Sequence, residues 1–271
     1  MKKRVLGLLL AGAMVASLTA CGGAGTNSSS SDSSSGSAPE GSTPVASGEK
    51  YVIAMDTSFP PFEFEDMDGN RIGIDIELLN AIAADQGLDL ELQALGFDAA
   101  LAAVDAGQAD AIMAGCSITE DRKLVMDFSE PYFDSGVAMG AAADNTDIQG
   151  YADLAGKNVA VKNGTEGAAF AQANKDEYGF TITIFDDSPT MYEDVLAGNS
   201  AACFEDYPVL GYGISQGNGL RMVGEMERGS SYGFGVKKGE NAELLAAFNT
   251  GLANLKENGK YQEILDKYIQ K

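Results

Sequence analysis

Short apolar segments alternate with amphipathic or Ala-rich segments from residue 51 onward. Apolar runs occupy 51–55, 90–95 and 109–115, and segments with a helical spacing of apolar residues occupy 75–86 and 98–106. Strands that alternate with helices in this way are typical of βαβ units, in which a helix connects two parallel strands. This part of the chain therefore predicts a β-α-β-α-β arrangement.

The same alternation returns later in the chain. Apolar runs lie at 158–162, 181–185 and 201–206, and segments of helical character lie at 165–174 and 189–197. The sequence therefore predicts a second α/β unit that resembles the first.

One stretch of each unit aligns with the other without a gap. VDAGQADAIMAG at 104–115 matches VLAGNSAACFED at 195–206, and the last residue of each stretch is the last residue of a predicted strand. Ligands of open parallel sheets bind beyond the carboxyl ends of the strands, so we expect 115–117 and 205–206 to border one cleft. Arg122 follows the first strand end, and a cation opposite carboxylates suits an α-amino-acid zwitterion. An Arg among acidic neighbours is also commonly a solvated surface residue, so this interpretation stays open.

The amino-terminal region predicts export and a lipid anchor. Residues 1–20 have basic residues before a short apolar run, as in a signal peptide, and LTAC at 18–21 resembles the lipobox of bacterial lipoproteins. This resemblance implies cleavage before Cys21 and diacylation of its sulfur; an ordinary signal peptide cut near Ala20 is the alternative. Residues 21–49 are rich in Ser and Gly without hydrophobic periodicity, so we expect a disordered tether after the lipidated Cys.

Composition excludes several function classes. The chain has 271 residues, 40 acidic and 18 basic side chains and a net charge of −22, which argues against binding to nucleic acid. It contains no His, so Ser-His-Asp triads and His-built metal sites are excluded. DMDGN at 66–70 has acidic residues spaced as in a calcium loop, but Arg71 stands where Gly is needed, so we expect a hairpin turn and no metal.

Several ordered motifs together resemble one known family. They are DTSFPPFEF (56–64), GIDIELLNAIA (73–83), the stretch 97–115, SITEDR (117–122), MDFSEPY (126–132), VAVKNGT (159–165) and ENGKYQEILDKY (257–268). From Tyr51 to about Lys271 the chain is similar to the solute-binding proteins of polar amino-acid ABC importers. That resemblance implies the type II periplasmic-binding-protein fold, with two α/β lobes around a ligand cleft.

The resemblance also implies how the chain divides. Residues 50–133 and 232–271 would form lobe 1, and 134–231 would form lobe 2. Two strands near 132–136 and 228–232 would cross between the lobes and act as a hinge. Closure about this hinge would bury the ligand, and a transporter would recognise the closed shape.

The family's ligand contacts can be carried over to matching residues. Arg122 would bind the α-carboxylate, helped by Ser117 and by backbone N–H groups near Thr165. Asp206 would bind the α-ammonium, together with the carbonyl of Gly115 and the Ser117 hydroxyl.

Two aromatic residues would form apolar walls of the pocket. Phe59 and Phe97 resemble the family's residues that cover the ligand side chain, since such pockets are mostly apolar. The alternatives are a packed loop aromatic for Phe59, next to Pro60 and Pro61, and a core residue at a helix start for Phe97.

Ligand selectivity would rest on Asp56, Lys162 and Glu205. In glutamine-binding members, an Asp and a Lys at the first two positions bind the carboxamide, which offers one donor and one acceptor. The chain departs from that pattern at Glu205, where some members have His, and at Ser117, where Thr is commoner. We expect glutamine first, then glutamate, with the basic amino acids arginine and lysine as the alternative.

These observations predict a monomeric, lipid-anchored receptor on the extracytoplasmic face of the cell membrane. It would deliver a polar amino acid to an ABC permease, with no cofactor and no catalytic residues. The alternatives are a dehydratase-type enzyme on the same fold and a ligand sensor without a transport role. Cys116 and Cys203 would lie in different lobes, where a disulfide would lock the cleft, so we expect free buried thiols.

Overall fold

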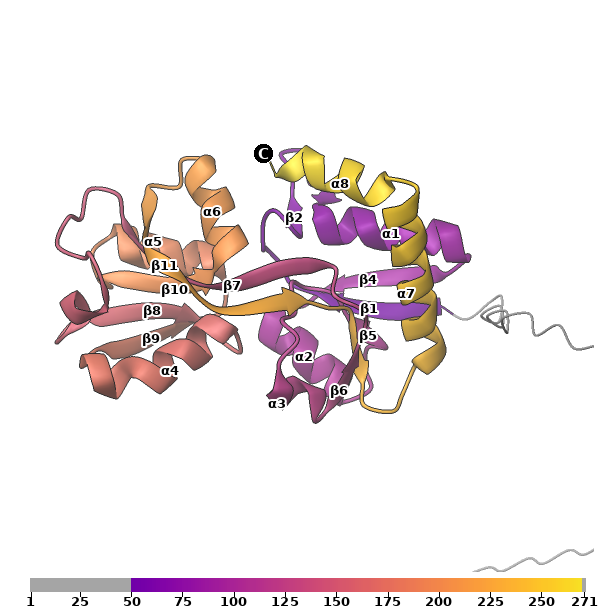
Figure 1. Cartoon of the computed structure of the whole chain (residues 1–271), viewed down its shortest axis with the longest axis horizontal. Coiled ribbons are helices and arrows are strands. Elements are labelled where there is room, and N and C mark those ends of the chain that lie inside the picture. The colour runs from indigo at the N-terminus through magenta and orange to yellow at the C-terminus, as the bar shows by residue number, and fades with distance from the viewer. Residues whose placement is uncertain (1–49, 270–271) are drawn as a thin grey trace, which may run out of the picture. The chain divides into compact units, whose positions relative to one another are not determined.

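The strands of the computed structural model, which describes residues 50–269, form two five-stranded sheets and one small hairpin (Figure 1). The predicted signal peptide, tether and Cys21 lie outside these residues. All of the described residues belong to one unit of the chain. We call the parts built on the two large sheets lobe 1 and lobe 2.

The sheet of lobe 1 has the order β4-β1-β5-β12-β6. Its strands are β4 (Asp89–Ala94), β1 (Lys50–Met55), β5 (Ala111–Ile112), β12 (Gly235–Lys237) and β6 (Met126–Phe128). Strand β1 pairs in parallel with β4 and β5, whereas β12 is antiparallel to β5 and β6. The helices of this lobe are α1 (Ile74–Gln86), α2 (Phe97–Asp105), α3 (Glu120–Lys123), α7 (Ala242–Glu257) and α8 (Lys260–Tyr268).

The sheet of lobe 2 has the order β11-β7-β10-β8-β9. Its strands are β11 (Leu220–Tyr232), β7 (Phe133–Ala142), β10 (Ala202–Asp206), β8 (Asn158–Lys162) and β9 (Thr181–Phe185). Strand β8 is parallel to β9 and β10, and β7 is antiparallel to β10 and β11. A 3₁₀ helix, η1 (Tyr151–Leu154), and the helices α4 (Glu166–Tyr178), α5 (Ser188–Leu196) and α6 (Tyr207–Ser215) complete the lobe.

The two aligned stretches occupy equivalent places in the two sheets. Residues 104–115 contain the end of α2 and β5, and 195–206 contain the end of α5 and β10. Both β5 and β10 have one parallel and one antiparallel neighbour. The alignment therefore marks a structural repeat, although it rests on few identities.

Two predicted elements differ from the structure by more than one residue at an end. The helix predicted at 165–174 continues to Tyr178, because Gly179, with a left-handed φ of 71°, terminates it rather than the end of the Ala-rich stretch. The strand predicted at 109–115 is shorter: β5 is Ala111–Ile112, and the backbone N–H groups of Asp110 and Met113 on either side still donate to β1. Gly115 has a φ of 55°, so the predicted end of the strand lies in a turn beyond β5.

Strands β7 and β11 run from one lobe into the other (Figure 1). They pair antiparallel, with Phe133 opposite Tyr232 and Ser135 opposite Ser230. The two predicted crossing strands are thus present, and both extend further into lobe 2 than expected. The exact lobe boundaries at 133/134 and 231/232 stay a prediction.

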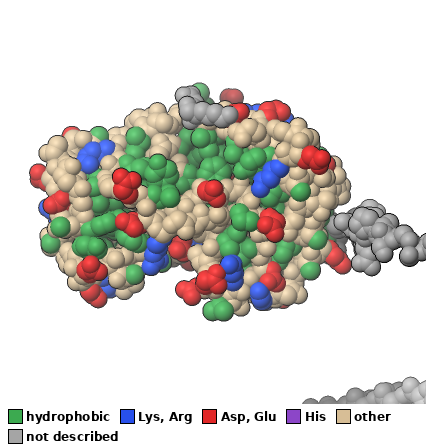
Figure 2. Space-filling view, in the orientation of Figure 1, with side chains coloured by type: hydrophobic (Ala, Val, Ile, Leu, Met, Phe, Trp, Pro, Cys, Tyr) green, Lys and Arg blue, Asp and Glu red, His purple; other side chains and the backbone are tan. Residues whose placement is uncertain are grey.

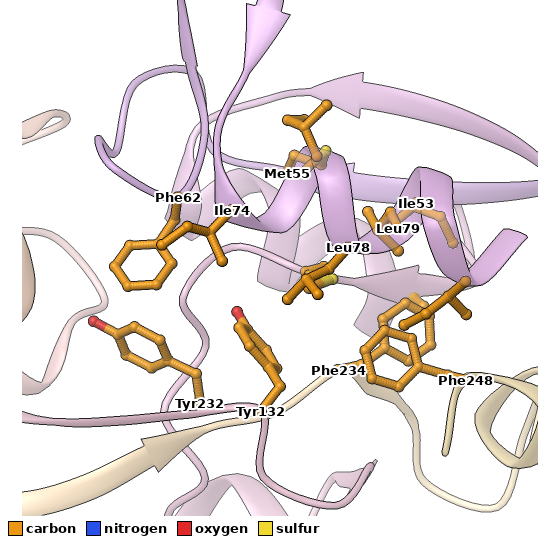
Figure 3. Close-up of a cluster of buried hydrophobic side chains, with 14 of the residues drawn as sticks. Ile53, Met55, Phe62, Ile74, Leu78, Leu79, Tyr132, Tyr232, Phe234 and Phe248 are labelled. Atoms are coloured by element: carbon orange, nitrogen blue, oxygen red, sulfur yellow. The ribbon is translucent and has the colours of Figure 1, made fainter. Parts of the chain in front are cut away.

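Two tyrosines join this crossing to the core of lobe 1. Figure 3 shows Tyr132 and Tyr232 with their hydroxyl ends on the side of Phe62 and Ile74. Both rings are buried, and Phe62 packs edge-on against Tyr232 with ring centroids 5.0 Å apart. The crossing strands are therefore anchored in lobe 1 by large buried side chains.

Further expectations can be checked in the described residues. β2 (Phe64–Glu65) and β3 (Arg71–Ile72) pair around 66–70, which confirms the hairpin turn. Cys116 and Cys203 are buried and free, as expected. Among residues 50–269, no helix has the length and apolarity needed to cross a bilayer. Figure 2 shows Asp and Glu side chains scattered over the visible face, which agrees with a solvated acidic surplus.

Candidate functional site

Arg122 projects from the short helix that follows the lobe 1 strand end. Thr119 caps this helix by accepting a hydrogen bond from the Arg122 backbone N–H. The guanidinium donates to the carbonyl of Ser117 (2.7 Å) and, across the cleft, to that of Gly164 (3.0 Å). It also lies over the Phe97 ring, 5.2 Å from the centroid. Its orientation is thus fixed, and its fork borders the cleft.

Asp206 ends β10 on the opposite side of the cleft and is buried. Its Oδ2 accepts a hydrogen bond from the Tyr232 hydroxyl at 2.6 Å. Burial first, and then the charge of Glu205, raise the pKa of Asp206 to about 7. A ligand ammonium would favour the ionised form of this carboxyl group.

Lys162 and Asp56 form an ion pair across the cleft. Lys162 Nζ lies 2.8 Å from Asp56 Oδ2, and the two side chains are 1% and 0% exposed. Nζ also lies 4.0 Å from the centroid of the Phe59 ring. Burial lowers the pKa of Lys162, but the charges of Asp56 and Glu205 outweigh it, so the pKa is raised. Lys162 is therefore charged in the pocket.

Glu205 is not among the residues that line the nearly closed cavity, and its expected contact with the ligand stays a prediction. Its Oε2 accepts from Ser188 Oγ (2.5 Å) and the Tyr192 hydroxyl (3.1 Å), and its Oε1 accepts from the Asp206 N–H (2.9 Å). Successive strand residues point to opposite faces, so Glu205 and Asp206 cannot both face the cleft. Glu205 acts on the pocket through its charge.

The residues that line the central cavity come from both lobes. They are Phe59, Phe97, Ala114, Gly115, Ser117, Arg122, Lys162, Thr165, Glu166 and Asp206. This set contains eight of the ten predicted residues. Of the other two, Asp56 pairs with the lining residue Lys162, and Glu205 accepts a hydrogen bond from Ser188.

Sequence reasoning missed Ala114 and Glu166. Glu166 follows Thr165, which caps α4 by accepting from the Ala168 N–H. Its place in the first turn of α4, directly after a predicted binding residue, could have indicated that it lines the cavity. Its carboxylate lies 3.8 Å from Arg228 Nη1 on β11.

The cavity is nearly closed in this arrangement. Measured to the centre of a water-sized sphere it is about 10 Å³, which is room for roughly one water molecule. The Arg122–Gly164 hydrogen bond and the Lys162–Asp56 ion pair both join lobe 1 to lobe 2. An amino acid would therefore enter only after the lobes move apart and these contacts open.

Comparison with known families identifies the chain. The model of the bacterial extracellular solute-binding proteins, family 3, matches residues 51–271. The chain belongs to this family. The resemblance to solute-binding proteins of polar amino-acid ABC importers is therefore confirmed.

Relatives of this solute-binding protein include several named for amino acids. The arginine-binding periplasmic protein of Mannheimia haemolytica is 35% identical over 222 residues, which cover 80% of this chain and 90% of the relative. The L-cystine-binding protein TcyJ of Escherichia coli strain K12 is 29% identical over 220 residues, covering 80% and 82%.

Solved structures confirm the type II periplasmic-binding-protein fold. Substrate binding domain 2 of Lactococcus lactis GlnP, in an open conformation, is 42% identical with a TM-score of 0.59, covering 85% of this chain and 98% of that one. An ancestral arginine-binding protein bound to glutamine is 33% identical with a TM-score of 0.76, covering 82% and 98%. The ancestral amino acid-binding protein AncCDT-1, a precursor of cyclohexadienyl dehydratase, is 28% identical with a TM-score of 0.75, covering 82% and 96%.

Proposed function

We propose that this solute-binding protein binds a polar amino acid, glutamine first and then glutamate, and delivers it to the permease of an ABC importer. Arg122 in lobe 1 binds the α-carboxylate, together with the Ser117 hydroxyl and the backbone N–H groups at the start of α4. Asp206 in lobe 2 binds the α-ammonium with the Gly115 carbonyl. The ligand then bridges both lobes and favours the closed state through contacts that the open state lacks.

The buried Lys162–Asp56 pair is the observation that supports glutamine. A carboxamide offers an oxygen to the Lys162 ammonium and an N–H to the Asp56 carboxylate, so it can insert into the pair with both charges satisfied. A cationic side chain would instead meet a charged ammonium that is 1% exposed. Like charges at such a site cost several kcal/mol, on the order of the penalty for wrong interface partners.

Basic amino acids are the second candidate. Several relatives are named as arginine-binding proteins. The site also has an acidic excess, since three buried carboxyl groups, Asp56, Glu205 and Asp206, accompany two cations, Arg122 and Lys162. Arginine would fit if Lys162 swung out of the pocket and left Asp56 to bind the guanidinium.

We also propose that the protein is a binding protein and not an enzyme, held at the extracytoplasmic face by a lipid on Cys21. The relatives named above are binding proteins. A dehydratase for a dicarboxylate would need a second cationic clamp and a general acid. Lys162 is the extra cation of the cavity lining, and Asp56 already pairs with it. Replacing Cys21 by Ala should remove labelling by palmitate and release the protein from the membrane.

Thermal unfolding of the purified protein with each of the twenty amino acids tests this proposal. A ligand at about 1,000 times its Kd adds about 4 kcal/mol to the free energy of unfolding. We expect the largest rise in Tm with glutamine and a smaller one with glutamate. A larger rise with arginine or lysine would favour the second candidate, and no rise with any amino acid would overturn both.

A further inference from the structure

Two carboxyl groups are buried together behind the ligand cavity. Glu63 and Asp75 are both 0% exposed. Glu63 Oε1 accepts a hydrogen bond from the backbone N–H of Asp56 at 3.1 Å. Asp75 Oδ2 accepts one from the backbone N–H of Gly115 and one from the Tyr132 hydroxyl, both at 3.0 Å. Each carboxyl group thus holds a backbone segment that reaches the ligand site.

The remaining oxygens indicate that one proton lies between the two groups. Glu63 Oε2 and Asp75 Oδ1 are buried and have no donor among the described residues. A hydrogen bond between the two carboxyl groups would require that one of them carry a proton. Two adjacent carboxylates cannot both stay ionised in a buried site. A shared proton removes the repulsion and satisfies both oxygens.

The donor count assigns the proton to Glu63. Asp75 accepts from two donors, Gly115 and Tyr132, whereas Glu63 accepts from one. Burial, then the charges of Asp75 and Asp56, raise the pKa of Glu63 well above its usual value, and burial raises the pKa of Asp75 to about 6. Glu63 Oε2–H therefore donates to the Asp75 carboxylate.

The pair fixes the two segments that form lobe 1's part of the pocket. Asp56 carries the carboxylate that pairs with Lys162, and Gly115 lines the cavity. Arg71 Nη1 holds the same turn from outside by donating to the carbonyls of Asp56 and Thr57, both at 3.2 Å. The Asp56 backbone is thus held on its N–H side by Glu63 and on its C=O side by Arg71.

We propose that Glu63 and Asp75 share one proton and act together as positioning residues, which orient the Asp56 turn and the Gly115 carbonyl for the ligand. The link to affinity rests on the proposed function, because it requires that Asp56 and Gly115 contact the bound amino acid. The shared proton does not depend on the identity of the ligand.

Other ionisable groups lie near the pair, and their titration must be distinguished from that of Glu63. The charge of Asp56, which pairs with Lys162, raises the pKa of Glu63. Tyr132 contacts Asp75, and Cys116 and Tyr232 are further ionisable groups near the pair. The pKa values of Cys116, Tyr132 and Tyr232 are raised by burial, so these groups stay neutral near pH 7. Asp206 has a pKa of about 7, so the test compares variants that all retain Asp206.

The first measurement is ligand-free unfolding of wild type and Glu63→Gln between pH 5 and 8. The amide of the variant can donate permanently to Asp75 while its oxygen still accepts from the Asp56 N–H. Because the pKa of Glu63 is raised in the folded state, the wild type takes up one proton more on folding than the Glu63→Gln variant does. As pH rises, we expect the ratio of the two unfolding equilibrium constants to change by about tenfold per pH unit in favour of the variant. Parallel profiles across this range would overturn the shared proton.

The second measurement is the Kd for the amino acid that most raises the Tm. We expect Glu63→Gln to keep the wild-type Kd, and Glu63→Leu to raise it by about tenfold, because the Asp56 N–H loses its acceptor. Phe248→Leu, in the core of lobe 1 away from the cavity, is the control for general destabilisation. A wild-type Kd for Glu63→Leu, or an equal rise for Phe248→Leu, would overturn the positioning role.

If Glu63→Leu does not fold, the pH dependence of the Kd decides instead. The ratio of the wild-type Kd to that of Glu63→Gln should rise above the pH at which the two unfolding profiles become parallel, because Glu63 then ionises in the folded protein and two repelling carboxylates displace the Asp56 turn. A constant ratio above that pH would overturn the positioning role. If no amino acid binds, the proposed function fails, but the ligand-free unfolding profiles still show whether Glu63 and Asp75 share a proton. The two proposals can therefore fail separately.

Discussion

The two lobes share a topology, and each contributes one cation and one carboxyl group to the site, at different positions. In both sheets, a strand with one parallel and one antiparallel neighbour leads to the cavity, β5 in lobe 1 and β10 in lobe 2. Beyond β5 lies the Arg122 cation, whereas β10 ends in the carboxyl group of Asp206, and both residues line the cavity. In the second pair the carboxylate, Asp56, comes from lobe 1, and the cation, Lys162, comes from lobe 2. The same scaffold thus forms a site of two complementary charge pairs.

The lobes also differ in how they stabilise buried carboxyl groups. In lobe 2, Glu205 is surrounded by three donors, from Ser188, Tyr192 and the Asp206 backbone. In lobe 1, Glu63 and Asp75 have fewer hydrogen-bond donors around them than carboxyl oxygens, and the shared proton satisfies the two oxygens that remain. In lobe 2 both carboxyl oxygens of Glu205 have donors from the protein, whereas in lobe 1 a shared proton supplies the missing donor. The two lobes should therefore respond differently to mutation and pH.

Loss of the lobe 1 cation should have the largest effect. Arg122→Ala should weaken binding of the amino acid by about 3 to 5 kcal/mol, because the α-carboxylate would be buried without its partner. Isothermal titration calorimetry measures the change. Lys123→Ala is the matched control, since the exposed Lys123 pairs only with Glu120 and should leave the Kd unchanged. A wild-type Kd for Arg122→Ala would show that the ligand does not bind through this residue.

Loss of the lobe 2 cation should change selectivity. Lys162→Met should weaken glutamine binding by about 1.5 to 3 kcal/mol, because a hydrogen bond to a charged group is lost. It should strengthen arginine binding, because Asp56 becomes available to a ligand cation. Kd values for both amino acids test this, with the exposed Lys157→Met as the control. An unchanged preference would place selectivity elsewhere in the pocket.

Protonation of Asp206 should weaken binding at low pH. In the free protein its pKa is raised to about 7, and the ligand ammonium binds the ionised form. The Kd should therefore rise by up to about tenfold for each pH unit below 7. The raised pKa also means that Asp206 stabilises the free fold most at low pH and that this contribution is lost as pH rises through about 7. Asp206→Asn should bind weakly at every pH, and a similar slope in that variant would assign the titration to another group.

Glu205→Gln should have the smallest effect of these changes. The side chain does not line the cavity, so we expect a change in the Kd of about fivefold or less. Its removal should also lower the pKa of Asp206, because Glu205 is the second-largest cause of the rise after burial. The pH profile of binding should therefore shift to lower pH. A loss of binding as large as that of Arg122→Ala would show that Glu205 contacts the ligand directly.

Sequence patterns predicted the elements and most of the cavity lining. Alternation of apolar runs with helical segments located β8 and β9 at their observed bounds. Ordered motifs located Arg122, Asp206 and the aromatic walls, because these residues follow strand ends or lie in the matching motifs. The end of a predicted strand gives positions along the chain and not faces of β10, so the sequence could not show that Asp206 lines the cavity and Glu205 does not.

The buried pair behind the pocket could not be predicted from the sequence. Asp75 lies in the first turn of α1, where the helix dipole alone accounts for an acidic residue. That it contacts Gly115 and Tyr132, 40 and 57 residues further along, depends on tertiary packing. The proton shared by Glu63 and Asp75 can be inferred only when the hydrogen-bond donors around the two carboxyl groups are known from the folded structure.

The central claim is that the cross-cleft Lys162–Asp56 pair selects a neutral carboxamide over a cationic side chain. Titration of the wild-type protein with glutamine and with arginine by isothermal titration calorimetry tests it most directly. We predict that glutamine binds at least about tenfold more tightly than arginine, since one like-charge contact at a buried site costs more than about 1.4 kcal/mol. Tighter binding of arginine would contradict this claim.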